Sequence, residues 1–250
     1  MKAIQIALVN ASSLADEDVA EGMVALQRQV SEDFAPVWGV DAELHLVTSE
    51  AAFSKKAKFP DRWGLVLEDH ELVTTRLGNH VRGYHDRTSY GLPAARVMVD
   101  QLDPGQDWTL VASHELLEML ADPDCNASVF RHPDATTLLF YAREVCDPCA
   151  AYDDGYEKCG RTVSDFVFPS WFQPTAPVRG ATRFDERGLI DEPFKVRPHG
   201  YIGVFQTSTG SWALQTYGGI VDFENQVGSR MERRNTADNR WLDSDMETAP

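Results

Sequence analysis

The stretch that most constrains the fold is residues 113–124, with the sequence SHELLEMLADPD. Its apolar residues lie on nearly all sides of a helix, which predicts that the helix is buried. Asp107 is the expected N-cap and Pro123 the expected stop, so a helix is predicted over 107–122. The histidine and two glutamates of this helix need partners, because an unpaired buried charge costs several kcal/mol.

Three side chains of the predicted helix form a possible metal motif. His114, Glu115 and Glu118 read H-E-x-x-E. Residues four apart lie on one face of a helix, so His114 and Glu118 could bind one metal ion together. Glu115 would then point beside that ion, where a general base for water belongs. The alternative is a core helix whose His and Glu residues pair with basic side chains or backbone groups.

Composition narrows the class of protein. A length of 250 residues suits one core with an appended module. The net charge of −16 argues against a nucleic-acid partner, which needs Lys and Arg gathered on one face. We expect no membrane partner, since no apolar run approaches the length of a membrane span. The N-terminal residues lack a secretion-signal pattern, so a cytoplasmic location is expected.

The chain before the motif helix is expected to alternate between strands and helix. Ser13 and Asp16 predict the start of a helix whose apolar stripe reaches Phe34. Pro93 favours an edge position for the strand that follows it. The polar stretch 69–90 is expected to be a long loop or an edge hairpin. Strands are predicted at residues 3–9, 43–47, 63–67 and 94–99.

This order of elements, with H-E-x-x-E on the helix after the edge strand, resembles the N-terminal subdomain of zincin-type metallopeptidases. The family motif is H-E-x-x-H, so Glu118 stands where the family has its second His. The resemblance covers roughly residues 1–170. It implies an α+β, zincin-like fold with a mixed β-sheet, an edge strand over the motif helix and a β-rich C-terminal part. It also implies bound zinc, water activated by Glu115, and a peptide or protein substrate paired with the edge strand.

A third metal ligand is needed, and the resemblance offers two candidates. Glu144, 26 residues after Glu118, resembles the downstream Glu of gluzincins, with Asp147 as an acid behind it. Asp124 lies ten residues after His114, where metzincin-type proteins place their third ligand. Glu144 is preferred, because it lies between the apolar run 138–141 and Val145, where a carboxylate needs a functional role or a partner. The predicted zinc ligands are therefore His114, Glu118 and Glu144.

Two further groups of residues leave alternatives open. Cys125, Cys146, Cys149 and Cys159 could form a four-thiolate zinc knot, form disulfides or stay free. His85 could approach substrate or metal, but a solvated loop histidine is the favoured interpretation.

Three parts are expected along the chain. They are a zincin-like N-terminal subdomain at 1–125, a Cys-containing loop region with a β-rich part at 126–228, and a disordered tail at 229–250. The expected function is a zinc-dependent metallopeptidase or hydrolase of another amide. The alternative is a catalytically inactive zincin-like module with a binding or structural role. The substrate is not readable, because specificity pockets come from loops.

Overall fold

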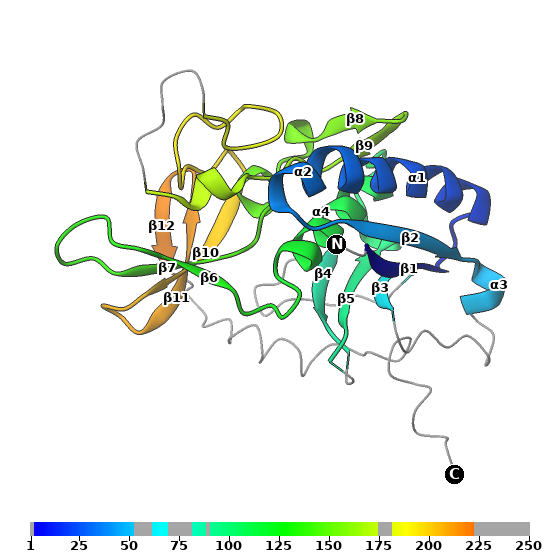
Figure 1. Cartoon of the computed structure of the whole chain (residues 1–250), viewed down its shortest axis with the longest axis horizontal. Coiled ribbons are helices and arrows are strands. Elements are labelled where there is room, and N and C mark those ends of the chain that lie inside the picture. Colours follow the sequence, from blue (N-terminus) through cyan, green and yellow to red (C-terminus); the bar gives the residue numbers. More distant parts are fainter. Residues whose placement is uncertain (1–2, 53–61, 70–81, 89–90, 175–181, 223–250) are drawn as a thin grey trace, which may run out of the picture.

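The computed structural model describes residues 3–52, 62–69, 82–88, 91–174 and 182–222. These residues form a mixed α+β structure with two five-stranded sheets and one two-stranded sheet (Figure 1). The tail predicted to be disordered, at 229–250, lies outside the described residues. Within the described part, no helix is both long and apolar enough to cross a bilayer.

The first sheet has the strand order β2-β1-β3-β5-β4. Its first four strands in this order are mutually parallel, and β4 runs antiparallel to β5. The strands expected at 3–9, 43–47, 63–67 and 94–99 are confirmed within one or two residues at each end. The bounds of these four are β1 Ile4–Ala11, β2 Ala42–Val47, β3 Trp63–Glu68 and β5 Pro93–Met98, and the fifth strand of the sheet is β4 Gly83–Arg87.

The predicted position of the edge strand is wrong. Strand β5 lies between β3 and β4, and all its residues are buried. Pro93 fits there because it is the first residue of the strand, where a missing N–H is tolerated. The edge strand is β4, which pairs antiparallel with β5 and lies in the polar stretch 69–90, so of the two predictions for that stretch the edge hairpin is confirmed at Gly83–Arg87. Its charged and polar residues are compatible with the end of the sheet, where only β5 pairs with it among the described strands.

The first helical segment lies over one face of this sheet. It consists of α1 Asp16–Arg28, a π-helical turn Gln29–Phe34 and α2 Ala35–Trp38. The predicted helix is present, but the capping role of Ser13 is wrong, because α1 begins at Asp16 after Ala15 and Ser13 forms a different contact. Its backbone N–H and hydroxyl donate to the Asp69 carboxylate, at 2.6 and 3.1 Å, and so join the helix entry to the end of β3.

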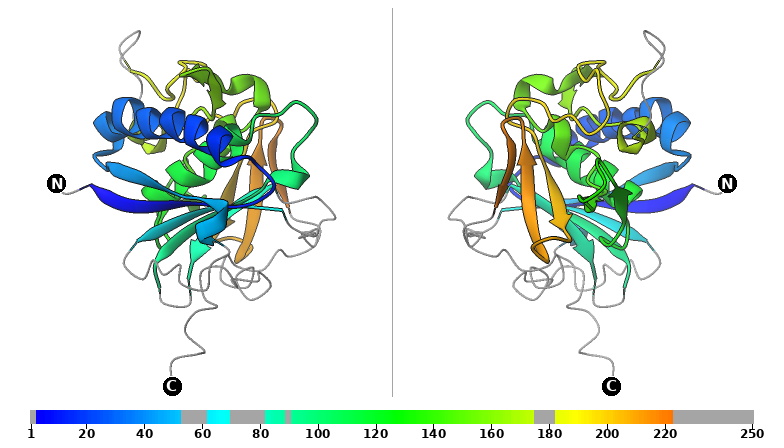
Figure 2. Two further views of the ribbon diagram at one scale, coloured as in Figure 1. Left: turned by 90° about the vertical axis from the view of Figure 1, so that its right-hand side faces the viewer. Right: turned by 90° about the vertical axis from the view of Figure 1, so that its left-hand side faces the viewer.

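The motif helix is confirmed as α4 Trp108–Ala121. It contacts β4, β5, α1 and the hairpin strand β9 Arg161–Val163, which pairs with β8 Tyr156–Lys158. Figure 2 shows α1 and α4 on the same side of the first sheet. The other side carries the short helix α3 Ser49–Ala52, which packs on a smaller apolar cluster.

The second sheet is antiparallel throughout and has the order β12-β11-β10-β7-β6. It lies to the left of the first sheet in Figure 1. One cluster of buried apolar residues includes Leu8, Leu116 and Tyr141, so both sheets and α4 share it. The strands are β6 Ser128–Arg131, β7 Leu139–Ala142, β10 Tyr201–Gln206, β11 Ser211–Thr216 and β12 Gly219–Asp222.

Candidate metal centre

Helix α4 carries the three motif side chains into the interior. The helix begins after Asp107, whose carboxylate accepts the N–H of Thr109 at 3.4 Å, as expected of an N-cap. Glu115 is 7% exposed and Glu118 is 4% exposed. Because α4 packs against β4 and β5, these acids meet the edge of the first sheet. His114 lies at the same level of the helix, with its side chain 16% exposed.

His114, Glu118 and Asp147 form the first group of possible metal ligands. One ligand atom from each lies within 4.8 Å of the others. His114 Nε2 is 3.5 Å from Glu118 Oε1 and 3.3 Å from Asp147 Oδ1. Glu118 Oε1 also accepts the backbone N–H of Cys146 at 3.2 Å. That bond ties α4 to the 3₁₀ turn Asp147–Cys149, which brings Asp147 to the histidine.

His85, Glu115 and Glu118 form a second group. His85 Nδ1 is 3.6 Å from Glu115 Oε2 and 3.6 Å from Glu118 Oε2, and its side chain is only 6% exposed. The favoured interpretation of His85 as a solvated loop residue is therefore wrong. Gly83 lies on the same face of β4, and a Cβ there would meet Glu115 Cγ at 2.8 Å. The missing side chain lets the strand approach the helix.

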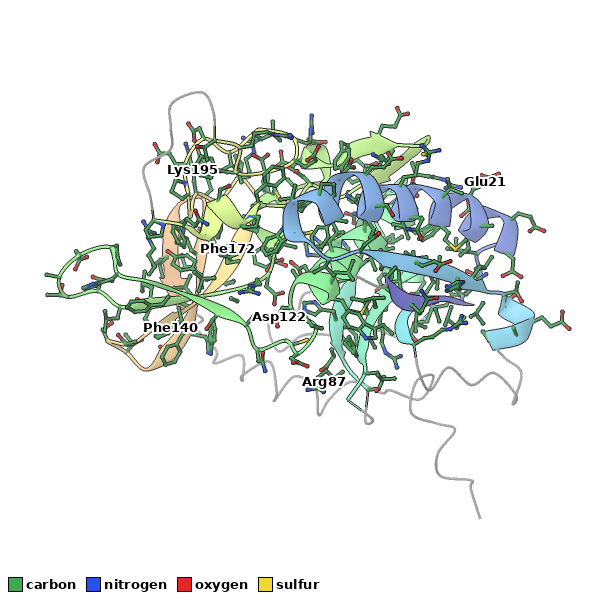
Figure 3. The ribbon with its side chains drawn as sticks, in the orientation of Figure 1. Glu21, Arg87, Asp122, Phe140, Phe172 and Lys195 are labelled. Carbon is green, nitrogen blue, oxygen red and sulfur yellow. The ribbon has the colours of Figure 1, made fainter. Side chains whose placement is uncertain are left out.

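The two predicted third ligands lie in different places. Glu144 Oε2 is 3.6 Å from His85 Nε2, so Glu144 reaches the cluster through the far side of that ring. Asp124 forms an ion pair with Arg87 at 3.1 Å, and its side chain is 53% exposed. Figure 3 shows Arg87 on the lower part of the molecule. The acid that the structure groups with His114 and Glu118 is Asp147.

The donor atoms of the first group fit a divalent cation. One imidazole and two carboxylates are ligands that Zn²⁺ accepts. The spacings of 3.3 and 3.5 Å around His114 Nε2 exceed the roughly 2.7–2.9 Å of a charge-assisted hydrogen bond. They are close to the separation of about 3.3–3.4 Å between two ligands on a tetrahedral ion with bonds of about 2.0–2.1 Å.

The cluster is strongly acidic. It brings together four carboxylates, those of Glu115, Glu118, Glu144 and Asp147. Burial alone would lower the pKa of His114, but Glu118, Asp147 and Glu115 favour the cationic ring and raise its pKa to about 10. A protonated His114 neutralises part of this negative charge, and a bound metal cation would neutralise it in the same way.

Tyr201 is a site residue that the sequence analysis missed. The charge of Asp147, together with burial of the hydroxyl end, raises the pKa of Tyr201 well above its usual value. The residue as a whole is 39% exposed, so part of the ring faces solvent while the hydroxyl lies among carboxylates. Gly200 makes this approach possible, since a Cβ there would lie 2.3 Å from the Pro148 carbonyl oxygen.

The cysteines stay outside both ligand groups. None of the four forms a disulfide, and Cys125, Cys146 and Cys149 are buried whereas Cys159 is exposed. The disulfide alternative is not what the structure shows, and the ligand groups found among the described residues contain no cysteine. Burial raises the pKa of the Cys146 and Cys149 thiols well above the usual value, so both stay protonated and unreactive near neutral pH.

Comparisons with protein-family models, with curated protein sequences and with solved structures gave no match. The function of this chain is therefore inferred from the chemistry of the cluster around α4.

Proposed function

We propose that this chain is a zincin-like, metal-dependent hydrolase of peptide or other amide bonds. The observation that carries the proposal is the grouping of His114, Glu118 and Asp147, with Glu115 beside them on α4. Zinc is the proposed ion, because one imidazole and two carboxylates at these spacings suit a tetrahedral site. In this proposal Asp147 takes the role that the sequence analysis predicted for Glu144.

Glu115 is the proposed general acid–base. A bound divalent ion would polarise the substrate carbonyl and make water easier to deprotonate. Glu115 would accept a proton from the attacking water and then donate it to the leaving amine. Its position is held from the strand side, because Glu115 Oε2 lies 3.6 Å from His85 Nδ1 and Gly83 lets β4 approach closely.

Tyr201 is the proposed hydrogen-bond donor to the reacting carbonyl. Its hydroxyl lies beside Asp147, at the side of the cluster where part of the ring is exposed. A phenol has one O–H, so this hydroxyl would have to turn from Asp147 to donate to the oxygen that gains negative charge as water adds.

Strand β4 supports a substrate with an extended backbone. It is the last strand of the first sheet as described and is antiparallel to β5. An extended peptide can add to such an edge through its backbone groups, as peptides do in β-augmentation. His85 on β4 reaches Glu115 on α4, so a peptide along β4 would pass close to the proposed base.

The alternative is a catalytically inactive zincin-like module that uses the ion for binding or structure. Glu118 and Asp147 give the site two carboxylates for one imidazole. Two negative ligands offset the charge of a divalent ion, which weakens its pull on a substrate carbonyl and on water. A protein that binds zinc at this site but has no hydrolytic activity would therefore be explained by its two carboxylate ligands.

The test is hydrolysis of a mixture of internally quenched peptides by protein loaded with one equivalent of zinc. We expect Glu115→Gln to keep its zinc and to lose roughly 10²–10⁴-fold in rate, the usual contribution of a general acid–base. His132→Ala, at an exposed histidine on the second sheet's hairpin, is the matched control and should retain both. Hydrolysis that Glu115→Gln retains would refute the catalytic role, and a zinc-loaded protein that cleaves none of the peptides would refute the peptidase and favour the inactive module.

A further inference from the structure

The carboxylate of Glu118 faces two histidines with its two oxygens. Oε1 lies 3.5 Å from His114 Nε2, and Oε2 lies 3.6 Å from His85 Nδ1. The two groups of possible ligands therefore share Glu118 and nothing else. A carboxylate placed in this way can bind one cation through each oxygen.

We propose that His85, Glu115 and Glu118 form a second divalent-cation site, and that a cation bound there removes Glu115 from catalysis. The spacings from His85 Nδ1 to Glu115 Oε2 and Glu118 Oε2 are both 3.6 Å. They are longer than a charge-assisted hydrogen bond and slightly wider than the ligand separation of about 3.3–3.4 Å on a tetrahedral zinc ion. Small side-chain movements would close that difference.

Glu144 supports the second site through the other ring nitrogen of His85. Its Oε2 lies 3.6 Å from His85 Nε2, the ring nitrogen that faces away from Glu115 and Glu118. Ligand histidines commonly donate their other ring N–H to a carboxylate, which fixes the tautomer and the ring orientation. Glu144 is therefore assigned as a positioning residue for His85.

The charge of the cluster also favours two cations. The four carboxylates of Glu115, Glu118, Glu144 and Asp147 lie around two imidazoles with little exposure to water. One divalent ion offsets two of these charges, and a second offsets the other two. Buried charges that are not offset are strongly unfavourable, so the cluster should bind a second cation when enough is present.

The first site should fill before the second. Its shortest ligand spacing is 3.3 Å, and the N–H of Cys146 anchors Glu118 Oε1. A cation at the second site would occupy Glu115 Oε2, the oxygen that must otherwise accept a proton from water. Activity should therefore rise as the first site fills and fall as the second fills. This inhibitory effect rests on the proposed function, whereas the second cation can be counted without any activity.

The experiment is equilibrium dialysis of the full chain against buffered Zn²⁺, with bound zinc measured by elemental mass spectrometry. We expect two zinc ions per wild-type chain, one per His85→Ala chain and two per His132→Ala chain. Glu144→Gln should still bind two, with the second roughly tenfold weaker, as is usual when a positioning carboxylate is altered. Circular dichroism of each variant checks that it is folded.

The outcomes separate this inference from the proposed function. Two ions in His85→Ala, or one in the wild type, would overturn the second site and leave the first intact. No bound zinc in the wild type would overturn both. If the wild type hydrolyses peptide, the ratio of its rate at ten equivalents of zinc to its rate at one should fall well below unity. In His85→Ala that ratio should return to near unity, and a ratio as low as that of the wild type would refute the inhibitory role.

Discussion

Replacing Gly200 with alanine should disturb the contact that places Tyr201 beside Asp147. The added Cβ would lie 2.3 Å from the carbonyl oxygen of Pro148, 2.8 Å from its carbonyl carbon and 3.0 Å from the carbonyl oxygen of Asp147. These are backbone atoms, which cannot rotate away as a flexible side chain can. Favourable contacts lie at about 3.5–4.0 Å, so the strand and the turn must separate by roughly 1 Å.

We expect Gly200→Ala to lower the free energy of unfolding by about 3 kcal/mol, the upper end of the range for overpacking. For a chain of this size that is a fall in Tm of about 6–12 °C. Gly203→Ala is the matched control inside β10, the strand that begins directly after Gly200, because its Cβ would meet Ala142 Cβ at 3.5 Å and Trp212 at 3.7 Å, which are ordinary contacts. It should change stability by no more than about 0.5 kcal/mol.

Thermal unfolding followed by circular dichroism, in the presence of EDTA, measures both variants without any contribution from bound metal. Equal Tm values for Gly200→Ala and Gly203→Ala would show that Gly200 does not pack closely against the Pro148 carbonyl group. Gly200→Ala should also bind zinc more weakly than Gly203→Ala, because the added Cβ would displace the turn that carries Asp147 and move it away from His114.

Two further predictions concern buried acids away from the proposed metal centre. Glu68 and Arg96 are 3% and 2% exposed, and their charged groups are 3.0 Å apart. Glu68→Ala should lower the free energy of unfolding in urea by about 3–5 kcal/mol, because it leaves Arg96 buried without its carboxylate. The double variant Glu68→Leu, Arg96→Leu should lower it clearly less. Burial, then the charge of Asp185, raises the pKa of Asp165 to about 8. The native state then keeps a proton that the unfolded chain loses near pH 4, so stability should fall by up to about 1.4 kcal/mol per pH unit between pH 4 and 8. That slope should flatten in Asp165→Asn, and an unchanged slope would rule out this assignment.

The motif helix could be predicted because its signals are local. Asp107 caps the first turn and Pro123 follows the last, and both lie within two residues of the observed ends. An apolar surface on nearly all sides indicated burial, and the structure buries α4 between the first sheet and the β8–β9 hairpin. The placement of His114 and Glu118 on one face follows from helix geometry alone.

The edge strand could not be predicted from hydrophobicity. Strand β4 has the sequence GYHDR, and an edge strand with polar side chains carries no apolar alternation. Its pairing with β5 depends on backbone hydrogen bonds that any sequence can make. Gly83 and His85 are two residues apart and therefore on one face of a strand, which is the signal that could have pointed His85 toward α4.

Asp147 was expected only as an acid behind Glu144, because the sequence did not define the turn that brings it to His114. The two acids are three residues apart, and the 3₁₀ turn Asp147–Cys149 directs the second one to His114. Tyr201 comes 54 residues after Asp147 and reaches it only because Gly200 packs against Pro148. Contacts between segments so far apart in the chain leave no local pattern to detect.

The measurement that tests the metal centre most directly compares Asp147→Ala with Glu144→Ala. Each protein is loaded with one equivalent of Zn²⁺, desalted and assayed by elemental mass spectrometry. Asp147→Ala should lose its zinc and Glu144→Ala should keep it, because Asp147 Oδ1 lies 3.3 Å from His114 Nε2 whereas Glu144 Oε2 lies 3.6 Å from Nε2 of His85, outside the group of His114, Glu118 and Asp147. Zinc retained by Asp147→Ala and lost by Glu144→Ala would contradict the proposed centre.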